Sequence, residues 1–156
     1  MPLLTPTMKN NLSQKYPKAV VGALLYNNTQ QILLVKSPKY PDWIIPGGHI
    51  EWGESMEFAL RREIKEELNL IVGQVQFIAV KEGFFYTKET TEIKRHFIFI
   101  DFLCEYIGGK IELNDELSEY RWYSFKKALQ LNMTPEMIDV IIIAQNLIKQ
   151  KNRIID

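Results

Sequence analysis

The order of apolar and polar residues predicts a series of short strands along most of the chain. Two apolar runs, residues 19–26 and 31–36, flank the polar stretch Asn-Asn-Thr-Gln, a pattern typical of a β-hairpin. A further short strand is predicted around Trp43, and it ends at Pro-Gly-Gly, a strong break in regular structure. The other strand-like runs cover residues 75–81, 97–105 and 120–123. The chain is therefore predicted to contain a β-sheet.

Residues 56–68 have the apolar spacing of an amphipathic helix. Ser55 can cap its N-terminus, and Glu57 in the first turn suits the positive end of the helix dipole. Asn69 follows the last helical residue and tolerates the left-handed conformation that ends many helices. At about 100° per residue, one face carries the apolar residues Met56, Ala59, Leu60, Ile64 and Leu68. We expect that face to pack on the sheet.

A second helix is predicted near the C-terminus. Thr134 is a suitable N-cap and Pro135 a suitable first helical residue, and the apolar residues that follow should dock on the sheet. The chain shows no repeat, low-complexity tract or linker. We therefore expect a single domain over residues 1–156, of the α/β class, with a mixed sheet, flanking helices and a loose N-terminal arm over residues 1–17.

Composition and charge exclude several classes of protein. Hydrophobic residues make up 46% and charged residues 24% of the chain, which argues against disorder. Nineteen basic residues balance nineteen acidic ones, so no overall field favours a nucleic acid polymer or an acidic membrane, although a local basic patch stays open. The oligomeric state is also left open, with a homodimer among the alternatives.

The expected compartment is reducing and intracellular. The single cysteine, Cys104, excludes an internal disulfide and a cysteine-rich zinc site, and a small buried thiol is the simpler interpretation. The N-terminus has no apolar core of signal-peptide length, and no later apolar run is long enough to span a bilayer. We therefore expect a soluble cytoplasmic protein.

The helix at residues 56–68 contains an unusual group of acidic residues. Glu63, Glu66 and Glu67 are spaced i, i+3 and i+4, so they lie at the edge of the apolar face within roughly 100° of arc. A solvated helix with internal ion pairs is the plain alternative, but it does not explain the like-charged pair of Glu63 and Glu67, which repel by a few tenths of a kcal/mol. A hard divalent cation such as Mg²⁺ would balance them through oxygen ligands.

The spacing around this helix resembles the Nudix box, Gly-x5-Glu-x7-Arg-Glu-U-x-Glu-Glu-x-Gly-U, in which U is bulky and apolar. Its matching positions are Gly48, Glu54, Arg62, Glu63, Ile64, Glu66, Glu67 and Leu70. Asn69 replaces the family's second Gly, and Asn also accepts left-handed dihedrals. The resemblance implies an α/β/α sandwich over most of the chain and a hydrolase that uses Mg²⁺, with Mn²⁺ as a substitute. Its products would be a nucleoside monophosphate and a phosphorylated remainder.

The resemblance also implies roles for the residues of the box. Glu63 and Glu67 become the leading metal ligands, and Glu66 a further ligand or the general base. The carbonyl of Gly48 is an additional ligand, Glu54 joins the metal network, and Arg62 orients the acidic cluster. Some members of the family add an acidic residue six positions before a Trp. Glu116 has that spacing to Trp122, and Glu119 is its rival. Either would bind an extra metal or serve as the general base, and both are equally well explained as exposed turn residues.

The substrate is less well defined by the sequence. The candidate contacts are Trp43 for a base, Lys36, Lys81, Arg95 and His96 for phosphates, and Tyr86, which resembles a Tyr of diadenosine-polyphosphate hydrolases. Each is also explained as a surface or core residue. A nucleoside triphosphate or similar nucleoside diphosphate derivative is the default small-molecule partner. The alternatives are a non-catalytic Nudix-fold module that binds a nucleotide, and a structural protein whose acidic helix binds a basic partner.

Overall fold

A mixed seven-stranded sheet forms the centre of the protein, whose computed structural model describes residues 15–89 and 91–155. The strands are β1 (Lys18–Tyr26), β2 (Gln31–Ser37), β3 (Tyr40–Ile44), β4 (Gly47–His49), β5 (Ile71–Tyr86), β6 (Ile93–Gly108) and β7 (Glu119–Ser124). Their order is β3-β2-β1-β6-β5, with β4 paired to β1 and β7 to β2. The pairing of β1 with β6 is parallel and the others are antiparallel. The predicted mixed sheet is confirmed.

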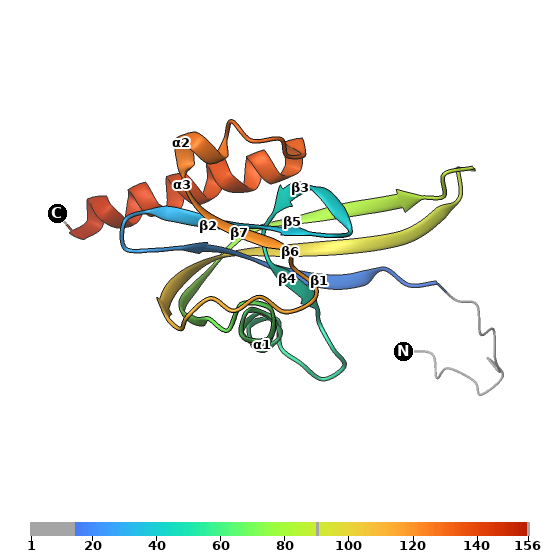
Figure 1. The fold of residues 1–156 in the computed structure, drawn as a ribbon, viewed down its shortest axis with the longest axis horizontal. Helices are drawn as coiled ribbons and strands as arrows, with labels where there is room; N and C mark the ends of the chain where they lie inside the picture. Colours follow the sequence, from blue (N-terminus) through green and yellow to red (C-terminus); the bar gives the residue numbers. More distant parts are fainter. Residues whose placement is uncertain (1–14, 90, 156) are drawn as a thin grey trace, which may run out of the picture.

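Helices cover both faces of this sheet (Figure 1). The helix α1 (Met56–Leu68) lies on one face, and α2 (Phe125–Ala128) and α3 (Pro135–Ile155) lie on the other. Each face has its own apolar core. One core joins α1 to side chains such as Leu25 and Leu33, and the other joins α2 and α3 to side chains such as Leu24 and Leu34. Because successive strand residues point to opposite faces, these two cores produce the expected α/β/α sandwich.

The ends of α1 follow from its local sequence. The Ser55 hydroxyl accepts a hydrogen bond from the backbone N–H of Phe58 at 3.1 Å, and Asn69 has φ 57° and ψ 32°, the left-handed conformation. Both predicted caps are confirmed. The prediction for Met56 was wrong, because its side chain is 47% exposed. The buried stripe begins at Ala59, so the first turn of the helix extends beyond its contact with the sheet.

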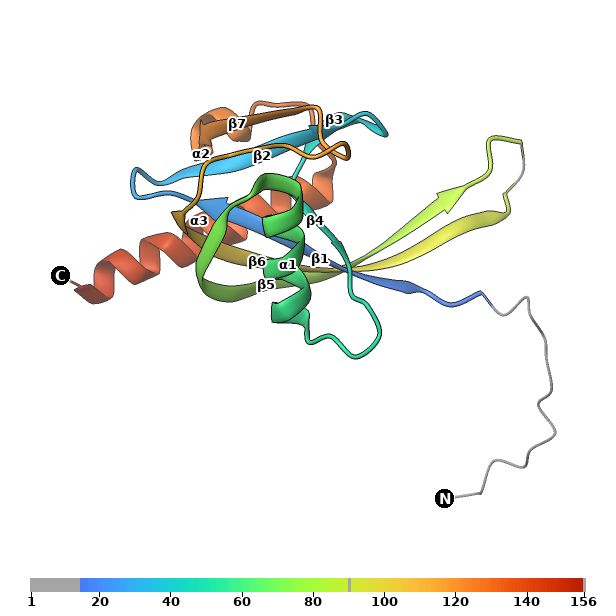
Figure 2. The ribbon, with the colours of Figure 1, turned by 60° about the horizontal axis from the view of Figure 1, so that its bottom comes forward.

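The strands β5 and β6 are longer than the sequence predicted. Each has 16 residues, and Phe97 of β6 is level with both Lys18, where β1 begins, and Gly83 of β5. Beyond that level the two strands continue as a hairpin that projects from the body (Figure 2). We call residues 84–86 and 93–96 of this hairpin the arm. Residues 84–86 alternate between exposed and half-buried, residues 93–95 are exposed, and no third strand of residues 15–89 and 91–155 pairs with them.

Two short elements were not predicted, β4 and α2, and α3 extends five residues beyond the predicted end at Gln150. Cys104 is buried, as expected, and burial raises the pKa of its thiol to about 12. Residues 1–14 of the predicted N-terminal arm lie outside the described residues, and the expected single domain stays a prediction. No helix in the described part of the chain is both long enough and apolar enough to cross a membrane.

Candidate active site

The acidic face of α1 lies directly against the Pro-Gly-Gly turn. The carboxyl group of Glu63 occupies the position where a side chain on Gly48 would lie, so any Cβ at Gly48 would collide with it. The backbone N–H of Gly47 donates a hydrogen bond to Oε2 of Glu67 at 3.1 Å. A side chain at residue 48 would therefore have to displace the carboxylate of Glu63 from the turn.

Glu67 is the most deeply buried of these carboxyl groups. Its residue is only 4% exposed, and burial raises its pKa from 4.5 to about 8. The hydrogen bond from the N–H of Gly47 lowers this pKa, while the charges of Glu63, Glu116 and Glu66 raise it further. Burial also raises the pKa of Glu63, against a hydrogen bond from Arg62 that lowers it. Glu63 therefore has a cationic partner, whereas the charges that act on Glu67 are all negative.

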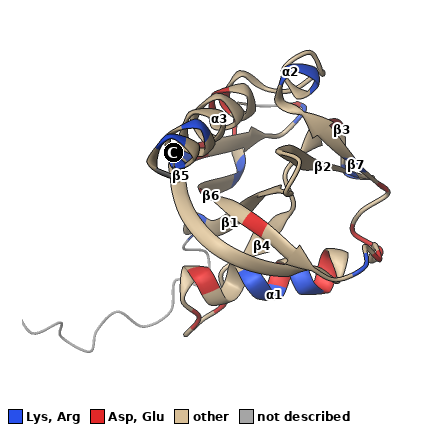
Figure 3. Ribbon diagram, turned by 90° about the vertical axis from the view of Figure 1, so that its left-hand side faces the viewer, with Lys and Arg blue, Asp and Glu red and all other residues tan. Residues whose placement is uncertain are grey.

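Arg62 holds the outer carboxylates of the cluster. Its guanidinium donates hydrogen bonds to Glu54 at 2.6 and 2.9 Å, to Glu63 at 2.9 Å and to Glu66 at 3.2 Å. It also bonds the carbonyl of His49 at 3.1 Å. The bond from Arg62 lowers the pKa of Glu54 to about 2. The predicted contact of Arg62 with the acidic cluster is confirmed, and Figure 3 shows acidic and basic residues alternating along α1.

Glu116 and Glu119, the two acidic residues predicted near the cluster, lie in different surroundings. The loop before β7 is tied to the end of α1, since Asn114 donates its backbone N–H to the carbonyl of Glu67 at 3.1 Å and Leu117 is buried in the core under α1. This places Glu116 near the cluster, where its charge raises the pKa of Glu67. Glu119 lies on β7 instead and pairs with Arg121 at 2.9 Å and with Lys36 at 4.0 Å.

The hydrogen bonds of β4 decide which carbonyl faces the carboxylates. Ala23 N–H bonds the carbonyl of Pro46 at 2.8 Å, and Ile50 N–H bonds the carbonyl of Ala19 at 3.1 Å. Because bonded and non-bonded pairs alternate in an antiparallel ladder, Gly48, opposite Val21, directs its carbonyl toward β1. The N–H and carbonyl of Gly47 point away from β1, to the side where Glu67 lies. Gly47, which the sequence did not single out, therefore has the freer carbonyl.

The donor set at this site fits a hard divalent cation. Carboxylate and carbonyl oxygens are the ligands that Mg²⁺ prefers, and Glu67 is a buried carboxyl group surrounded by three like charges. Within residues 15–89 and 91–155, no three His, Cys, Asp or Glu side chains already form a metal-binding group.

The proposed substrate contacts lie in three different environments. The Nζ of Lys36 lies 4.8 Å from the ring centre of Trp43, and that ring packs edge-on against Tyr123. Lys81 pairs with Asp101 at 2.8 Å. The described structure therefore already engages Lys36, Trp43 and Lys81 in the body of the protein.

The other candidates lie on the arm. His96 bonds Glu82 at 3.1 Å, Tyr86 is 58% exposed, and Arg95 lies over aromatic rings. Sequence reasoning missed Asp101, a buried acid on the sheet. The sequence feature that indicates this residue is a single acid within the apolar run Phe-Ile-Phe-Ile-Asp-Phe-Leu.

Comparison with known proteins places this geometry in a family. The sequence profile of the NUDIX domain matches residues 16–142. An ADP-ribose pyrophosphatase of Methanocaldococcus jannaschii is 29% identical over 126 residues, which are 79% of this chain and 71% of that protein. The 8-oxo-dGDP phosphatase NUDT18 of Danio rerio is 31% identical over 119 residues, 72% of this chain but 34% of that protein. The chain thus spans about a third of the Danio rerio protein.

Solved structures agree on the fold. The NUDIX domain of Shewanella oneidensis NrtR, in a cocrystal with ADP ribose, superposes with a TM-score of 0.70 at 17% identity, covering 89% of this chain and 93% of that one. A MutT protein of Bacillus halodurans superposes with a TM-score of 0.65 at 21% identity, covering 81% and 79% of the two chains. At these identities the likeness concerns the fold alone.

Proposed function

Because this chain belongs to the NUDIX domain family and is a Nudix hydrolase that acts on phosphoric anhydride bonds, we propose that it is a metal-dependent nucleotide pyrophosphohydrolase. Its substrate is a nucleoside diphosphate linked to another group. The products are a nucleoside monophosphate and a phosphorylated remainder, which is pyrophosphate when the substrate is a nucleoside triphosphate. The observation that carries this proposal is the buried Glu67, surrounded by like charges beside the glycine turn.

Mg²⁺, with Mn²⁺ as a substitute, is the proposed cofactor. Glu63 and Glu67 would hold it, with Glu66 and Glu54 as further members of the acidic network. The sequence favours Gly48 for the carbonyl ligand, whereas the ladder of β4 favours Gly47. A bound divalent cation polarises phosphoryl oxygens and lowers the pKa of a bound water.

The chain's own residues would supply positioning and proton transfer. Glu67 is fixed against the turn by burial and by the N–H of Gly47, and Glu63 is held by a hydrogen bond from Arg62. Arg62 holds the outer carboxylates in place through five hydrogen bonds, one of them to the backbone of His49. A general base must accept a proton from the attacking water. Glu116, whose charge acts on Glu67, is the first candidate and the 56%-exposed Glu66 the second.

The substrate class is supported by the named relatives and by the composition. Both curated relatives described above carry names of enzymes that act on nucleoside diphosphate compounds. The balanced charge of the chain gives no general attraction for a nucleic acid polymer. We therefore propose a small nucleotide as the partner and a cytoplasmic location, and a homodimer stays a prediction.

The competing proposal is a module that binds a nucleotide without hydrolysing it. The presence of four acidic side chains at Glu54, Glu63, Glu66 and Glu67 favours the enzyme, because binding alone does not need all of them. A screen of nucleoside polyphosphates and nucleotide sugars with Mg²⁺, followed by product analysis, distinguishes the two. We expect turnover that stops on addition of EDTA. Tight nucleotide binding without any product would support the binding module.

Glu67→Gln provides the internal test of the site. The amide fills the same volume but is a poor ligand for Mg²⁺, so we expect turnover to fall by several orders of magnitude in a folded protein. The matched control is Glu57→Gln, on the same helix, where the carboxylate is 61% exposed and pairs with Arg61. That control should retain full activity. Near-normal turnover in Glu67→Gln would remove this residue from the active site.

A further inference from the structure

The segment between β6 and β7 is attached to the last turn of α1. We call residues 109–118 the β6–β7 loop. A helix ends with backbone carbonyls that have no partner within the helix. Here the carbonyl of Leu68 accepts the N–H of Glu112 at 3.0 Å, and the carbonyl of Glu67 accepts the N–H of Asn114 at 3.1 Å. The loop is therefore bonded to the backbone of the same residue whose carboxyl group is the most deeply buried in the site.

Beyond this attachment, Asn114 begins a tight turn. Its backbone carbonyl accepts the N–H of Leu117 at 3.3 Å, and its side-chain Oδ1 accepts the N–H of Glu116 at 3.0 Å. An Asn at the first position of a turn commonly bonds the backbone two residues farther on. Leu117 is buried in the core under α1, and the N–H of Ser118 bonds the carbonyl of Lys36 at 2.8 Å. Both ends of the turn are thus fixed, and the side chain of Asn114 holds the backbone of Glu116 between them.

Asn114 links Glu67 to Glu116 through two consecutive hydrogen bonds. The N–H of Asn114 bonds the carbonyl of Glu67, and Oδ1 of Asn114 accepts the N–H of Glu116. Glu116 is exposed, yet its negative charge raises the pKa of both Glu63 and Glu67. An exposed Glu side chain adopts several rotamers, and fixing it costs conformational entropy. A backbone that is held in place reduces the range of positions that its carboxylate can reach.

We propose that Asn114 is a positioning residue, whose side chain holds Glu116 beside Glu67 for proton transfer during hydrolysis. The inference rests on the proposed function, in which Glu116 accepts a proton from the attacking water. Asn114 acts through the hydrogen bond that its Oδ1 accepts from the N–H of Glu116, and it does not touch the reacting atoms. A general base must lie within hydrogen-bond reach of the proton that it removes. Loss of this bond should therefore slow the chemical step without weakening the binding of the substrate.

Three substitutions at residue 114 test this role through steady-state kinetics with Mg²⁺. Asn114→Ala removes Oδ1 but retains the backbone N–H that bonds Glu67, and we expect kcat to fall about tenfold or more. KM should stay within about twofold of the starting protein, because only the chemical step is affected. Asn114→Gln places its amide one carbon farther out, so it cannot close the same turn and should behave like Asn114→Ala. Asn114→Asp retains an acceptor at the same position and should restore most of the activity.

The matched control is Asn27→Ala, which removes the same kind of bond from another turn. Oδ1 of Asn27 accepts the N–H of Thr29 at 3.1 Å and that of Gln31 at 2.9 Å. Asn27 lies six residues beyond Val21, which is level with Gly48, so it is about 20 Å away along the strand. This variant should lose thermal stability much as Asn114→Ala does, and its kcat should be unchanged. The comparison separates the effect of a weakened turn from an effect on the site.

A double-mutant cycle shows whether Asn114 acts through Glu116. When Glu116→Gln has already removed the base, Asn114→Ala should lower kcat by less than about twofold more, because the two changes remove the same function. A further fall as large as that caused by Asn114→Ala alone would overturn the proposal. So would a normal kcat in Asn114→Ala, or a kcat in Asn114→Asp that is as low as in Asn114→Ala.

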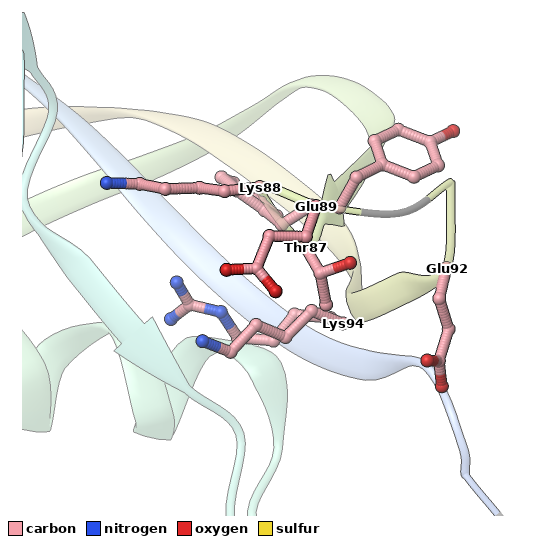
Figure 4. Close-up of a pocket in the computed structure, with 8 residues that line it drawn as sticks. Thr87, Lys88, Glu89, Glu92 and Lys94 are labelled. Atoms are coloured by element: carbon pink, nitrogen blue, oxygen red, sulfur yellow. The ribbon is translucent and has the colours of Figure 1, made fainter.

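Backbone ¹⁵N relaxation in EDTA tests the positioning without turnover. The amide of Glu116 should have an order parameter of about 0.85 in the starting protein and below about 0.6 in Asn114→Ala. The amide of Lys94, on the arm at the other end of β6 (Figure 4), is the reference and should not change.

The two measurements distinguish a failure of this inference from a failure of the proposed function. Order lost at Glu116 in a protein without any turnover would reject the enzyme and keep Asn114 as the residue that holds this turn. Turnover with equal order at Glu116 in both proteins would keep the enzyme and overturn the role of Asn114.

Discussion

Removing the charge of Glu67 should change the stability of the metal-free protein in a pH-dependent way. The change is Glu67→Gln, which retains the size of the side chain and an oxygen that accepts the N–H of Gly47. The carboxyl group is 4% exposed, and burial raises its pKa from 4.5 to about 8. The folded protein therefore holds this proton more tightly than the unfolded chain does.

The sign and size of the effect follow from linkage. Below about pH 4.5 the carboxyl is neutral in both states, and the fold has its full stability from this group. Between pH 4.5 and 8 the unfolded chain ionises first, so stability falls as the pH rises by up to about 1.4 kcal/mol per pH unit. Across the interval of about 3.5 units, the total reaches an upper limit of about 5 kcal/mol. The Gln variant lacks this loss.

The assay is urea unfolding in EDTA, followed by tryptophan fluorescence at pH 5, 7 and 8.5. Comparison of the variant with the starting protein cancels the titration of the other groups. We expect similar stabilities at pH 5 and an advantage of several kcal/mol for Glu67→Gln at pH 8.5. Glu57→Gln is the control, since its exposed ion pair with Arg61 contributes only about 0.5 kcal/mol at any of these pH values. Parallel pH curves for Glu67→Gln and the starting protein would refute the reasoning.

Three further changes test other parts of the site. Asn69→Gly should be neutral or slightly stabilising in a thermal melt, because φ is 57° at this residue and Gly has no Cβ to strain; a clear loss of stability would contradict the role of the cap. Glu116→Gln should lower turnover while Glu119→Gln leaves it nearly unchanged, since only the first lies beside the cluster; equal, near-normal rates would move the general base to the helix. Arg62→Lys should raise the pKa of Glu54 from about 2, because an ammonium group cannot reproduce the bidentate contact; an unchanged NMR titration of that carboxyl would argue against it.

The parts of the fold that the sequence predicted well depend on local chemistry. The limits of α1 follow from Ser55 and Asn69, which act on neighbouring backbone groups. The contact of Arg62 with the acidic cluster also arises within one helix and its entrance loop. The approach of Glu63 to Gly48 is expected from the glycine turn that the box requires.

The parts that were not predicted depend on tertiary pairing. In the arm, β5 and β6 continue beyond the predicted ends because the two strands pair with each other. The residue pattern of one strand alone does not reveal this pairing. The choice of Glu116 over Glu119 depends on the bond from Asn114 to α1. Gly47 and Gly48 are alike in sequence, and only the register of β4 separates their carbonyls. Asp101 acquires its burial from neighbouring strands.

The central claim is that the chain cleaves a nucleotide anhydride with the aid of the carboxylates on α1. The most direct test is hydrolysis of a nucleoside triphosphate in ¹⁸O-labelled water with Mg²⁺, with the products followed by ³¹P NMR. The proposed mechanism predicts a monophosphate and pyrophosphate as products, one of which carries the label. It also predicts that no hydrolysis occurs in EDTA. Orthophosphate as the sole early product, or an unchanged rate in EDTA, would contradict it.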